Sequence, residues 1–154
     1  MTHPVVHGFF GPYRFLSNFH LVNVELDGEI YRSTEHAYQA AKTLNLDERR
    51  LIQLAPLPRD ARRLGQTVQI QPSWDQLKFT VMYELTCQKF ANDPLMTKLL
   101  DTGAAHLEET NTWGDTYWGV CNGIGKNNLG KILMFVREDL RAIQEQYLLD
   151  ELDR

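Results

Sequence analysis

The chain has 154 residues, of which 43% are hydrophobic and 23% charged, a composition typical of one soluble globular domain. No apolar run approaches the roughly 20 residues that a membrane-spanning helix needs, and the N-terminal residues lack the pattern of a signal peptide. The net charge of −4 argues against DNA binding over a broad surface, although one basic cluster comprises Arg49, Arg50, Arg59, Arg62 and Arg63. Two cysteines without CxxC spacing indicate a reduced setting, so we expect a cytoplasmic protein.

The N-terminal part of the chain carries strand signals. Residues 5 to 10 are mostly apolar and end at Gly11-Pro12, which indicates a short strand. Residues 21 to 26 and 29 to 31 flank Asp27-Gly28. This dipeptide predicts a two-residue hairpin, because the favoured turn needs positive φ at both central positions. We therefore expect a small antiparallel β element near the N-terminus.

Six helices are predicted after the hairpin, from caps and from apolar residues at helical spacing. Ser33 or Thr34 caps the first helix, and Gly65 is placed as the C-terminal cap of the third. The predicted ranges are 34 to 44, 47 to 54, 58 to 64, 74 to 91, 93 to 103, and a last helix from Leu129 through Tyr147. The expected fold is mainly α: a compact helical bundle that forms a single domain over residues 1–154.

Residues 111 to 128 show no helical or strand periodicity and hold four of the ten glycines and two of the three tryptophans. Long irregular loops in compact domains usually have a function. Glycines allow a ligand to approach the backbone, and the indoles of Trp113 and Trp118 offer flat faces for a base or sugar. Because a helix follows, its first amides are expected to lack partners and to receive a phosphate. The alternative is a glycine-rich surface connection.

This loop does not fit the phosphate-binding P-loop pattern. That pattern needs Gly, four residues, and then Gly-Lys followed by Ser or Thr. Here Asn127 follows Gly125-Lys126, and Val120 stands where the first glycine should be. An NTPase of this class is excluded.

One face of the first predicted helix collects three polar residues. Glu35, Gln39 and Lys42 stand at i, i+4 and i+7, so their side chains point to the same side. Glu35 lies in the first turn, where the helix dipole favours an ionised carboxylate that can stabilise positive charge or act as a nucleophile or base. The alternative is an exposed helix with a solvated Glu–Lys pair.

A second carboxylate, Asp115, lies in the glycine-rich loop. It either holds the loop through an Asx-turn or, if it faces Glu35, completes a pair of carboxylates of the kind that glycoside cleavage uses. No HxxxH, HExxH or cysteine cluster occurs, so neither a metal site nor a cofactor is expected.

Three segments together resemble one family. They are GPYRFLSNF at residues 11 to 19, STEHAYQAAK at 33 to 42 and YWGVCNGIGKNNLGKILM at 117 to 134. In this order they resemble the NADAR family, also called YbiA-like N-glycosidases, over about residues 7 to 141. The resemblance implies a compact, mainly helical domain that hydrolyses N-glycosidic bonds to ribose phosphates.

The family resemblance implies two substrate classes. Some members cleave early intermediates of riboflavin biosynthesis, and others remove ADP-ribose from guanine in nucleic acid. The expected partner is therefore a small ribosyl phosphate or an ADP-ribosyl substrate, which for the second class is attached to nucleic acid. Bacterial riboflavin-linked members carry DGGHG after Trp-Gly, whereas this chain has Val120-Cys121-Asn122-Gly123, which leaves the substrate open.

The resemblance assigns roles to Glu35, Trp74 and Asp115, and the chemistry of ribosyl bond cleavage suggests the other contacts. Glu35 and Asp115 are the implied catalytic carboxylates, and Lys42 could instead attack C1′ and form an imine. The expected substrate contacts are Trp74, Trp113, Trp118, Gln39, Asn18, Gly123, Gly125, Lys126, Asn127 and Asn128. The alternative function is a non-catalytic module that binds ADP-ribose or NAD, because such a module would use the same loop without an ionised Glu35.

Overall fold

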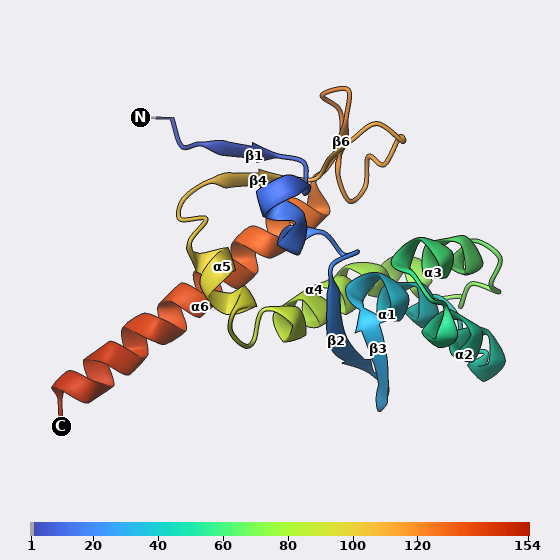
Figure 1. Cartoon of the computed structure of the whole chain (residues 1–154), viewed down its shortest axis with the longest axis horizontal. Coiled ribbons are helices and arrows are strands. Elements are labelled where there is room, and N and C mark those ends of the chain that lie inside the picture. Colours follow the sequence, from blue (N-terminus) through green and yellow to red (C-terminus); the bar gives the residue numbers. More distant parts are fainter. Residues whose placement is uncertain (1) are drawn as a thin grey trace. The chain divides into compact units, whose positions relative to one another are not determined.

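A computed structural model describes residues 2–154 (Figure 1). Helices account for more of these residues than strands do, which confirms the mainly α prediction. The helices are η1 Gly11–Leu16, α1 Thr34–Ala41, α2 Leu46–Leu54, α3 Pro58–Gly65, α4 Trp74–Lys89, α5 Leu95–Leu100 and α6 Asn128–Leu152. The strands are β1 Val5–His7, β2 Leu21–Leu26, β3 Glu29–Ser33, β4 His106–Glu108, β5 Thr110–Asn111 and β6 Val120–Cys121.

Residue contacts group the chain into two units. Unit 1 comprises the described residues up to Leu16 together with Phe90–Arg154, and unit 2 is Ser17–Lys89. Each unit is described by itself below. A single bundle that forms one domain over the whole chain therefore stays a prediction.

Unit 2 is built around α1. The β2–β3 hairpin is antiparallel, pairs Val24 with Tyr31, and turns at Asp27 and Gly28, whose φ angles are 49° and 82°. The hairpin predicted from Asp27-Gly28 is thus present. Helix α1 packs against this hairpin and against α2, α3 and α4, and all eight of its residues are buried. A helix that is surrounded on every side can hold polar groups away from water.

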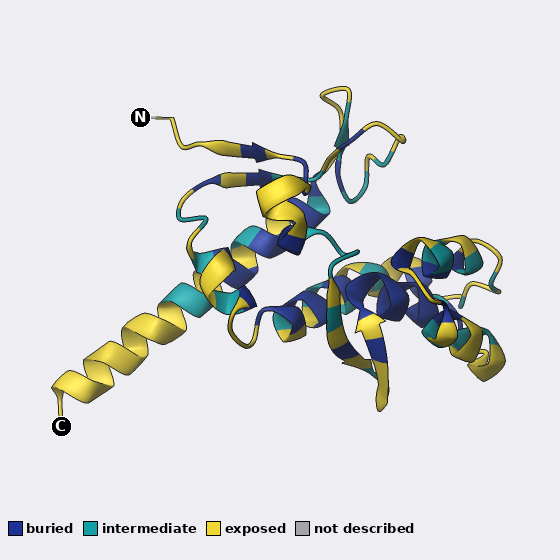
Figure 2. Cartoon of the chain, viewed as in Figure 1, coloured by how far each residue is buried: buried dark blue, intermediate teal, exposed yellow. Residues whose placement is uncertain are grey.

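Unit 1 combines a short parallel strand pair with the longest helix. β1 pairs with β4 in parallel, and α6 packs on β4 and α5. A Cβ on Gly130 would lie 2.1 Å from the Leu107 carbonyl oxygen, so glycine is required for this close approach of α6 to β4. The buried residues of α6 lie in its first half, and the second half is mostly exposed (Figure 2).

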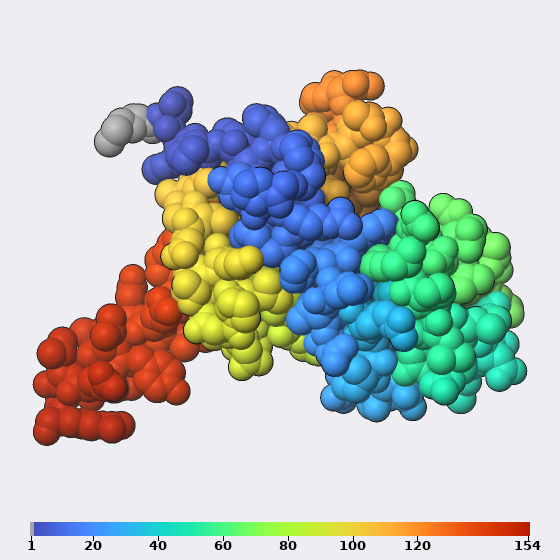
Figure 3. Space-filling model, in the orientation of Figure 1, coloured from blue at the N-terminus to red at the C-terminus, as the bar shows by residue number. Residues whose placement is uncertain are grey.

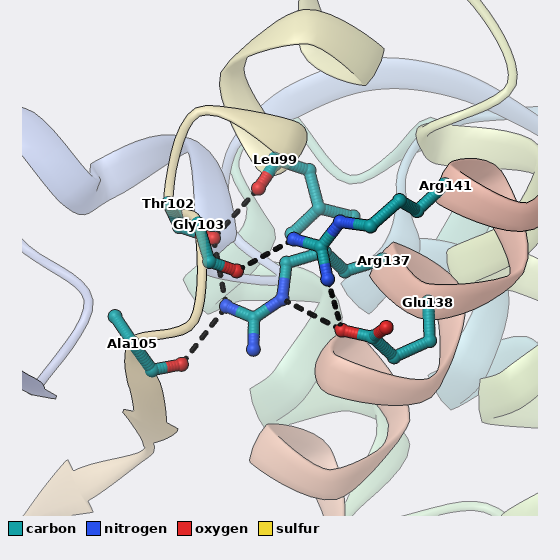
Figure 4. Close-up of polar contacts among 7 residues, drawn as sticks. All are labelled: Leu99, Thr102, Gly103, Ala105, Arg137, Glu138 and Arg141. Carbon is teal, nitrogen blue, oxygen red and sulfur yellow. Dashed lines mark hydrogen bonds and ion pairs between the residues drawn. The ribbon is translucent and has the colours of Figure 1, made fainter. Parts of the chain in front are cut away.

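Two arginines of α6 hold the connection between α5 and β4 (Figure 4). Arg137 Nη1 donates to Thr102 Oγ1 and to the Ala105 carbonyl oxygen, both at 2.9 Å. Arg141 Nη2 donates to the Gly103 carbonyl oxygen at 2.8 Å. Burial lowers the pKa of Arg137. These bonds fix the start of β4, and β4 leads directly into the loop that the sequence marks as functional.

Several predicted elements differ from the structure. Helix α1 ends at Ala41 rather than residue 44, because Asn45 adopts an extended conformation and its side chain accepts the amides of Asp47 and Glu48 to cap α2. Helix α5 is also shorter than predicted. The loop shows no strand periodicity in the sequence, but β6 lies within it and pairs in parallel with β5 at its start. Within residues 2–154, no helix combines the length and the apolar character needed to cross a bilayer.

Candidate functional site

One group of predicted site residues lies in unit 2, at and after the N-terminal turn of α1. Ser33 caps this helix because its side chain accepts the His36 amide. Glu35 follows in the first turn and is 7% exposed, and Gln39 one turn later is 5% exposed. The alternative of an exposed helix with a solvated Glu–Lys pair is therefore wrong. A buried carboxylate needs hydrogen-bond donors, because leaving water without them is costly.

Glu35 is held by groups of its own unit. Gln39 Nε2 donates to Glu35 Oε1 at 2.8 Å, so the two side chains meet as the i, i+4 spacing predicted. The Glu35 amide donates to the Asn18 carbonyl oxygen at 3.1 Å, and Asn18 Nδ2 contacts Met82 Sδ at 3.5 Å. The irregular segment that contains Asn18 thus packs beside the carboxylate-bearing turn.

Lys42 is the third polar residue on this face and caps the end of α1. Burial lowers the pKa of Lys42, the charge of Glu35 opposes that shift, and the charges of Arg62 and Lys78 add to it. Its Nζ lies 5.8 Å from the centroid of the Tyr38 ring. A half-buried amine with a lowered pKa is deprotonated more often at neutral pH than an exposed lysine, which makes it a better nucleophile.

An aromatic pair lies beside these polar groups. Tyr38 and Trp74 are both buried, and their ring centroids are 5.2 Å apart at an interplanar angle of 54°. Sequence reasoning missed the electrostatic effect of Arg62 and Lys78 on Lys42. Lys78 stands one turn after Trp74 on α4, so helical spacing could have found it once Trp74 was placed in the site.

His36 stabilises the cap of α1 and is not placed for proton transfer. Its Nε2 lies 2.9 Å from the Ala55 carbonyl oxygen, which can only accept, so Nε2 carries the proton. Nδ1 then accepts from Ser33 Oγ at 2.7 Å. Burial lowers the pKa of His36, which favours this neutral tautomer.

The other group of predicted site residues lies in unit 1, in the loop between β5 and α6, drawn in orange in the space-filling view (Figure 3). Asp115 Oδ1 accepts the amides of Tyr117 and Trp118 at 3.2 and 2.9 Å. The Asn111 side chain bridges to the backbone of Asp115 in both directions. Asp115 thus performs the Asx-turn role that was one of its two predicted roles. Its catalytic role stays a prediction.

The start of α6 differs from the expected phosphate site. The amides of residues 126 to 129 donate to the carbonyl oxygens of Thr116, Gly119, Tyr117 and Trp118 at 2.8 to 3.3 Å. The expectation that these amides lack partners is wrong, because the loop folds back and supplies carbonyls to the helix end. Backbone donors for a phosphate would therefore have to come from elsewhere in the loop.

The side chain of Asn127 is also hydrogen-bonded to backbone groups. Its Oδ1 accepts the Glu109 amide and its Nδ2 donates to the Leu107 carbonyl oxygen, both at 2.9 Å. Asn127 also adopts a left-handed conformation with φ of 53°. Gly123, with φ of 76°, forms the turn between Cys121 and Ile124. A Cβ on Gly125 would lie 2.1 Å from the Gly119 carbonyl oxygen. All three residues shape the loop.

Aromatic and basic side chains gather on this loop. Tyr117 and Trp118 rings meet edge to face with centroids 4.8 Å apart, and Lys126 Nζ lies 5.7 Å from the Tyr117 centroid. Trp113 is 57% exposed. These groups could stack on a base and neutralise a phosphate. Among residues 2–154, no group of three or more His, Cys, Asp or Glu side chains is arranged to hold a metal ion.

The predicted site residues fall in both units. Unit 2 holds Asn18, Glu35, Gln39, Lys42 and Trp74; unit 1 holds Trp113, Asp115, Trp118, Gly123, Gly125, Lys126, Asn127 and Asn128. Within unit 2, the structure joins Glu35 to Gln39 and to Asn18. The pairing of Glu35 with Asp115, and substrate binding by any of these residues, stay predictions.

Comparisons with known proteins agree on one family. Residues 8–141 match the model of the NADAR domain. The chain is 36% identical to an N-glycosidase of Nostoc punctiforme over 139 residues, which cover 86% of this chain and 88% of that protein. It is 34% identical to a riboflavin biosynthesis protein of Vibrio vulnificus, covering 90% of this chain but 39% of that longer protein. The NMR structure of Escherichia coli YbiA matches with a TM-score of 0.80 and 32% identity, covering 95% of this chain and 90% of that one.

Proposed function

The chain belongs to the NADAR domain family, and from this premise we propose that it is a hydrolase of N-glycosidic bonds. The bond would join a ribose phosphate or ADP-ribose to a nucleobase-like amine. The observation that carries the proposal is the buried Glu35 carboxylate, oriented by the 2.8 Å hydrogen bond from Gln39. The similarity to proteins named N-glycosidases supports the reaction class.

The proposed chemistry follows from what cleavage of a ribosyl C–N bond requires. As the bond breaks, positive charge develops at C1′ and negative charge on the leaving base. A fixed carboxylate in a pocket of low dielectric stabilises the first charge, since it needs no reorganisation during the reaction. We assign this role to Glu35, and the activation of water to Asp115, which keeps Oδ2 outside the bonds that hold the Asx-turn.

A second mechanism assigns the attack to Lys42. Its neutral Nζ would attack C1′ as the C–N bond breaks, and the base would leave with the electron pair of that bond and take up the proton that Nζ loses. The ribosylamine would then open to an imine, and water would release the sugar aldehyde and restore the amine. The lowered pKa of Lys42, caused first by burial, supports this step. Borohydride added during turnover should then leave a reduced sugar adduct at Lys42, seen by peptide mass spectrometry. If Lys42 stays unmodified while the protein turns over substrate, this second mechanism fails and only charge stabilisation by Glu35 remains.

The proposed ligand contacts follow from the chemistry of the substrate. The aromatic faces of Trp74, Trp113 and Trp118 suit a nucleobase, and Lys126 and Asn128 suit a phosphate. Asn18 and Gln39 lie beside Glu35 and suit ribose hydroxyls. We expect Gly123, Gly125 and Asn127 to affect substrate binding indirectly, because they fix the shape of the loop. We further expect a cytoplasmic enzyme that needs no metal or cofactor.

The test is a hydrolysis assay with two substrates in parallel, in the presence of EDTA. One is the ribosylaminopyrimidine phosphate of riboflavin biosynthesis, and the other is an oligonucleotide that carries ADP-ribosyl-guanine. Release of ribose 5-phosphate or of ADP-ribose identifies the substrate class by mass spectrometry. Glu35→Gln should abolish either signal. Glu84→Gln, which alters an exposed carboxylate on α4 of the same unit, is the matched control.

Two outcomes would contradict the proposal. Equal turnover by wild type and Glu35→Gln would remove the role of the carboxylate. Tight ADP-ribose binding by calorimetry, with neither substrate cleaved, would favour the non-catalytic binding module.

A further inference from the structure

The last residue of α3, Gly65, lies against the side chain of Gln39. A Cβ on Gly65 would lie 2.0 Å from Gln39 Oε1, 2.7 Å from its Cδ and 2.9 Å from its Cβ. Gly65 does not have a positive φ, and the cap of α3 is Gln66, in an ordinary helical conformation. The sequence places Gly65 as a C-terminal cap, but the structure shows another reason for glycine there: a Cβ would displace the side chain of Gln39.

The Gln39 amide can take only one orientation here. Its Nε2 donates to Glu35 Oε1, and its Oε1 faces Gly65. Turning the amide over would bring Oε1 against the carboxylate, and two acceptors would then repel each other. The Gly65 hydrogen that takes the place of a Cβ points toward Oε1, which is a weak contact at best.

This arrangement has a cost that needs an explanation. Gln39 Oε1 is buried and has no hydrogen-bond partner among the residues that the structure describes. An unsatisfied buried acceptor is rare in native structures. An apolar side chain at this position would avoid that cost, so the presence of glutamine beside Glu35 points to a role for the donated hydrogen bond.

We propose that Gln39 is a positioning residue for the Glu35 carboxylate. Gly65 allows α3 to pack so closely on Gln39 that it holds this side chain in place. This rests on the proposed hydrolase function, in which Glu35 stabilises charge at C1′. Glutamine has several rotamers, and confinement by α3 removes the alternatives before the substrate arrives. The donated hydrogen bond favours the ionised carboxylate and fixes its plane.

The first test is Gln39→Leu, which keeps the size of the side chain and removes the donor. The titration of the Glu35 carboxyl is followed by carbon-13 NMR, with Glu35→Gln used to assign the signal. Its midpoint should move to higher pH in Gln39→Leu, while the charged neighbours Lys42, Arg62 and Lys78 stay unchanged. An unmoved midpoint would overturn the proposal.

The same variant has an expected kinetic signature. The kcat should fall about tenfold or more with a smaller change in KM, because the lost hydrogen bond to a charged group acts on the transition state. The acid limb of the pH–rate profile should move in the direction of the NMR titration. If wild type cleaves neither substrate, the proposed hydrolase function fails, and the NMR titration still decides the role of Gln39.

The role of Gly65 is tested by a double-mutant cycle with Gln39→Ala. Gly65→Ala alone should lower both Tm and kcat, since its methyl displaces Gln39. In the Gln39→Ala background the same change should cost much less in Tm, because Oε1 and Cδ are gone. An equal loss of Tm in both backgrounds would show that the methyl group is not excluded by Oε1 and Cδ of Gln39, and would overturn the proposed role of Gly65.

Discussion

Two regions that the sequence marks as functional satisfy their polar groups in opposite ways. On α1 in unit 2, Glu35 is buried, and two neighbours, Thr34 Oγ1 and Gln39 Oε1, lack hydrogen-bond partners in the described chain. In the loop of unit 1, the Asp115 carboxylate, the Asn127 side chain and the amides of residues 126 to 129 all bond the loop's own backbone or its neighbours. The first arrangement leaves buried polar groups unsatisfied, and the second uses its polar groups to hold a shape.

This contrast separates the residues that we assign to catalysis from the residues that stabilise the loop. Sites held for function often give up stability, because charges and unsatisfied acceptors are kept out of water. A loop that satisfies its own backbone gains stability and presents its side chains rigidly. We therefore expect substitutions of Glu35 and Gln39 to change rate more than stability, and substitutions of the loop's polar residues to change stability first.

The largest effect is expected for Glu35→Gln. Turnover should fall roughly thousandfold, as for the loss of a main electrostatic group, while Tm should stay equal or rise. The substituted amide keeps an oxygen that can accept from Gln39 Nε2, and a buried charge is removed. Kinetics and thermal melts of the same preparation check this. A large loss of Tm would show that Glu35 stabilises the fold, and would contradict the difference that we draw between α1 and the loop.

The next effect is expected for Asn127→Ala in the loop. Two hydrogen bonds to buried backbone groups are lost and alanine is forced into a left-handed conformation, so stability should fall by about 3 kcal/mol. Asn127→Gly is the matched control, because glycine accepts the conformation and loses only the bonds. Urea unfolding should place it between wild type and alanine. Equal stability of all three proteins would contradict the assigned support role.

Two variants of Asp115 separate its structural role in the Asx-turn from its proposed role in activating water. Asp115→Ala should cost about 2 kcal/mol, because two amides lose their acceptor. Asp115→Asn keeps an oxygen for these amides and removes the charge, so it should unfold like wild type. If it also keeps full turnover, the proposed activation of water by Asp115 fails and only the Asx-turn remains.

The local features of this chain were more predictable than the contacts between distant segments. Asp27-Gly28 predicted the hairpin, and helical spacing predicted that Glu35 and Gln39 meet, since both depend on neighbours within a few residues. The partners of the α6 amides could not be predicted, because they are carbonyls of a loop without periodicity. The contact of Gly65 with Gln39 was missed for a similar reason: a glycine at a helix end suggests a cap, and only the packing of α3 on α1 shows the close approach.

The smallest effect is expected from His36, which supports the reactive helix without touching its chemistry. Burial lowers its pKa below the ordinary 6.5, so the folded protein holds the neutral form. As pH falls below 6.5, the unfolded chain takes up the proton first, and stability should fall by at most about 1.4 kcal/mol per pH unit. Above 6.5 this contribution is fully present. Urea unfolding at several pH values, with His36→Gln subtracted to remove the other groups, measures the slope. Parallel curves for wild type and His36→Gln would mean that the Ser33–His36–Ala55 contacts do not depend on the neutral ring, and that the cap of α1 is held by backbone packing alone.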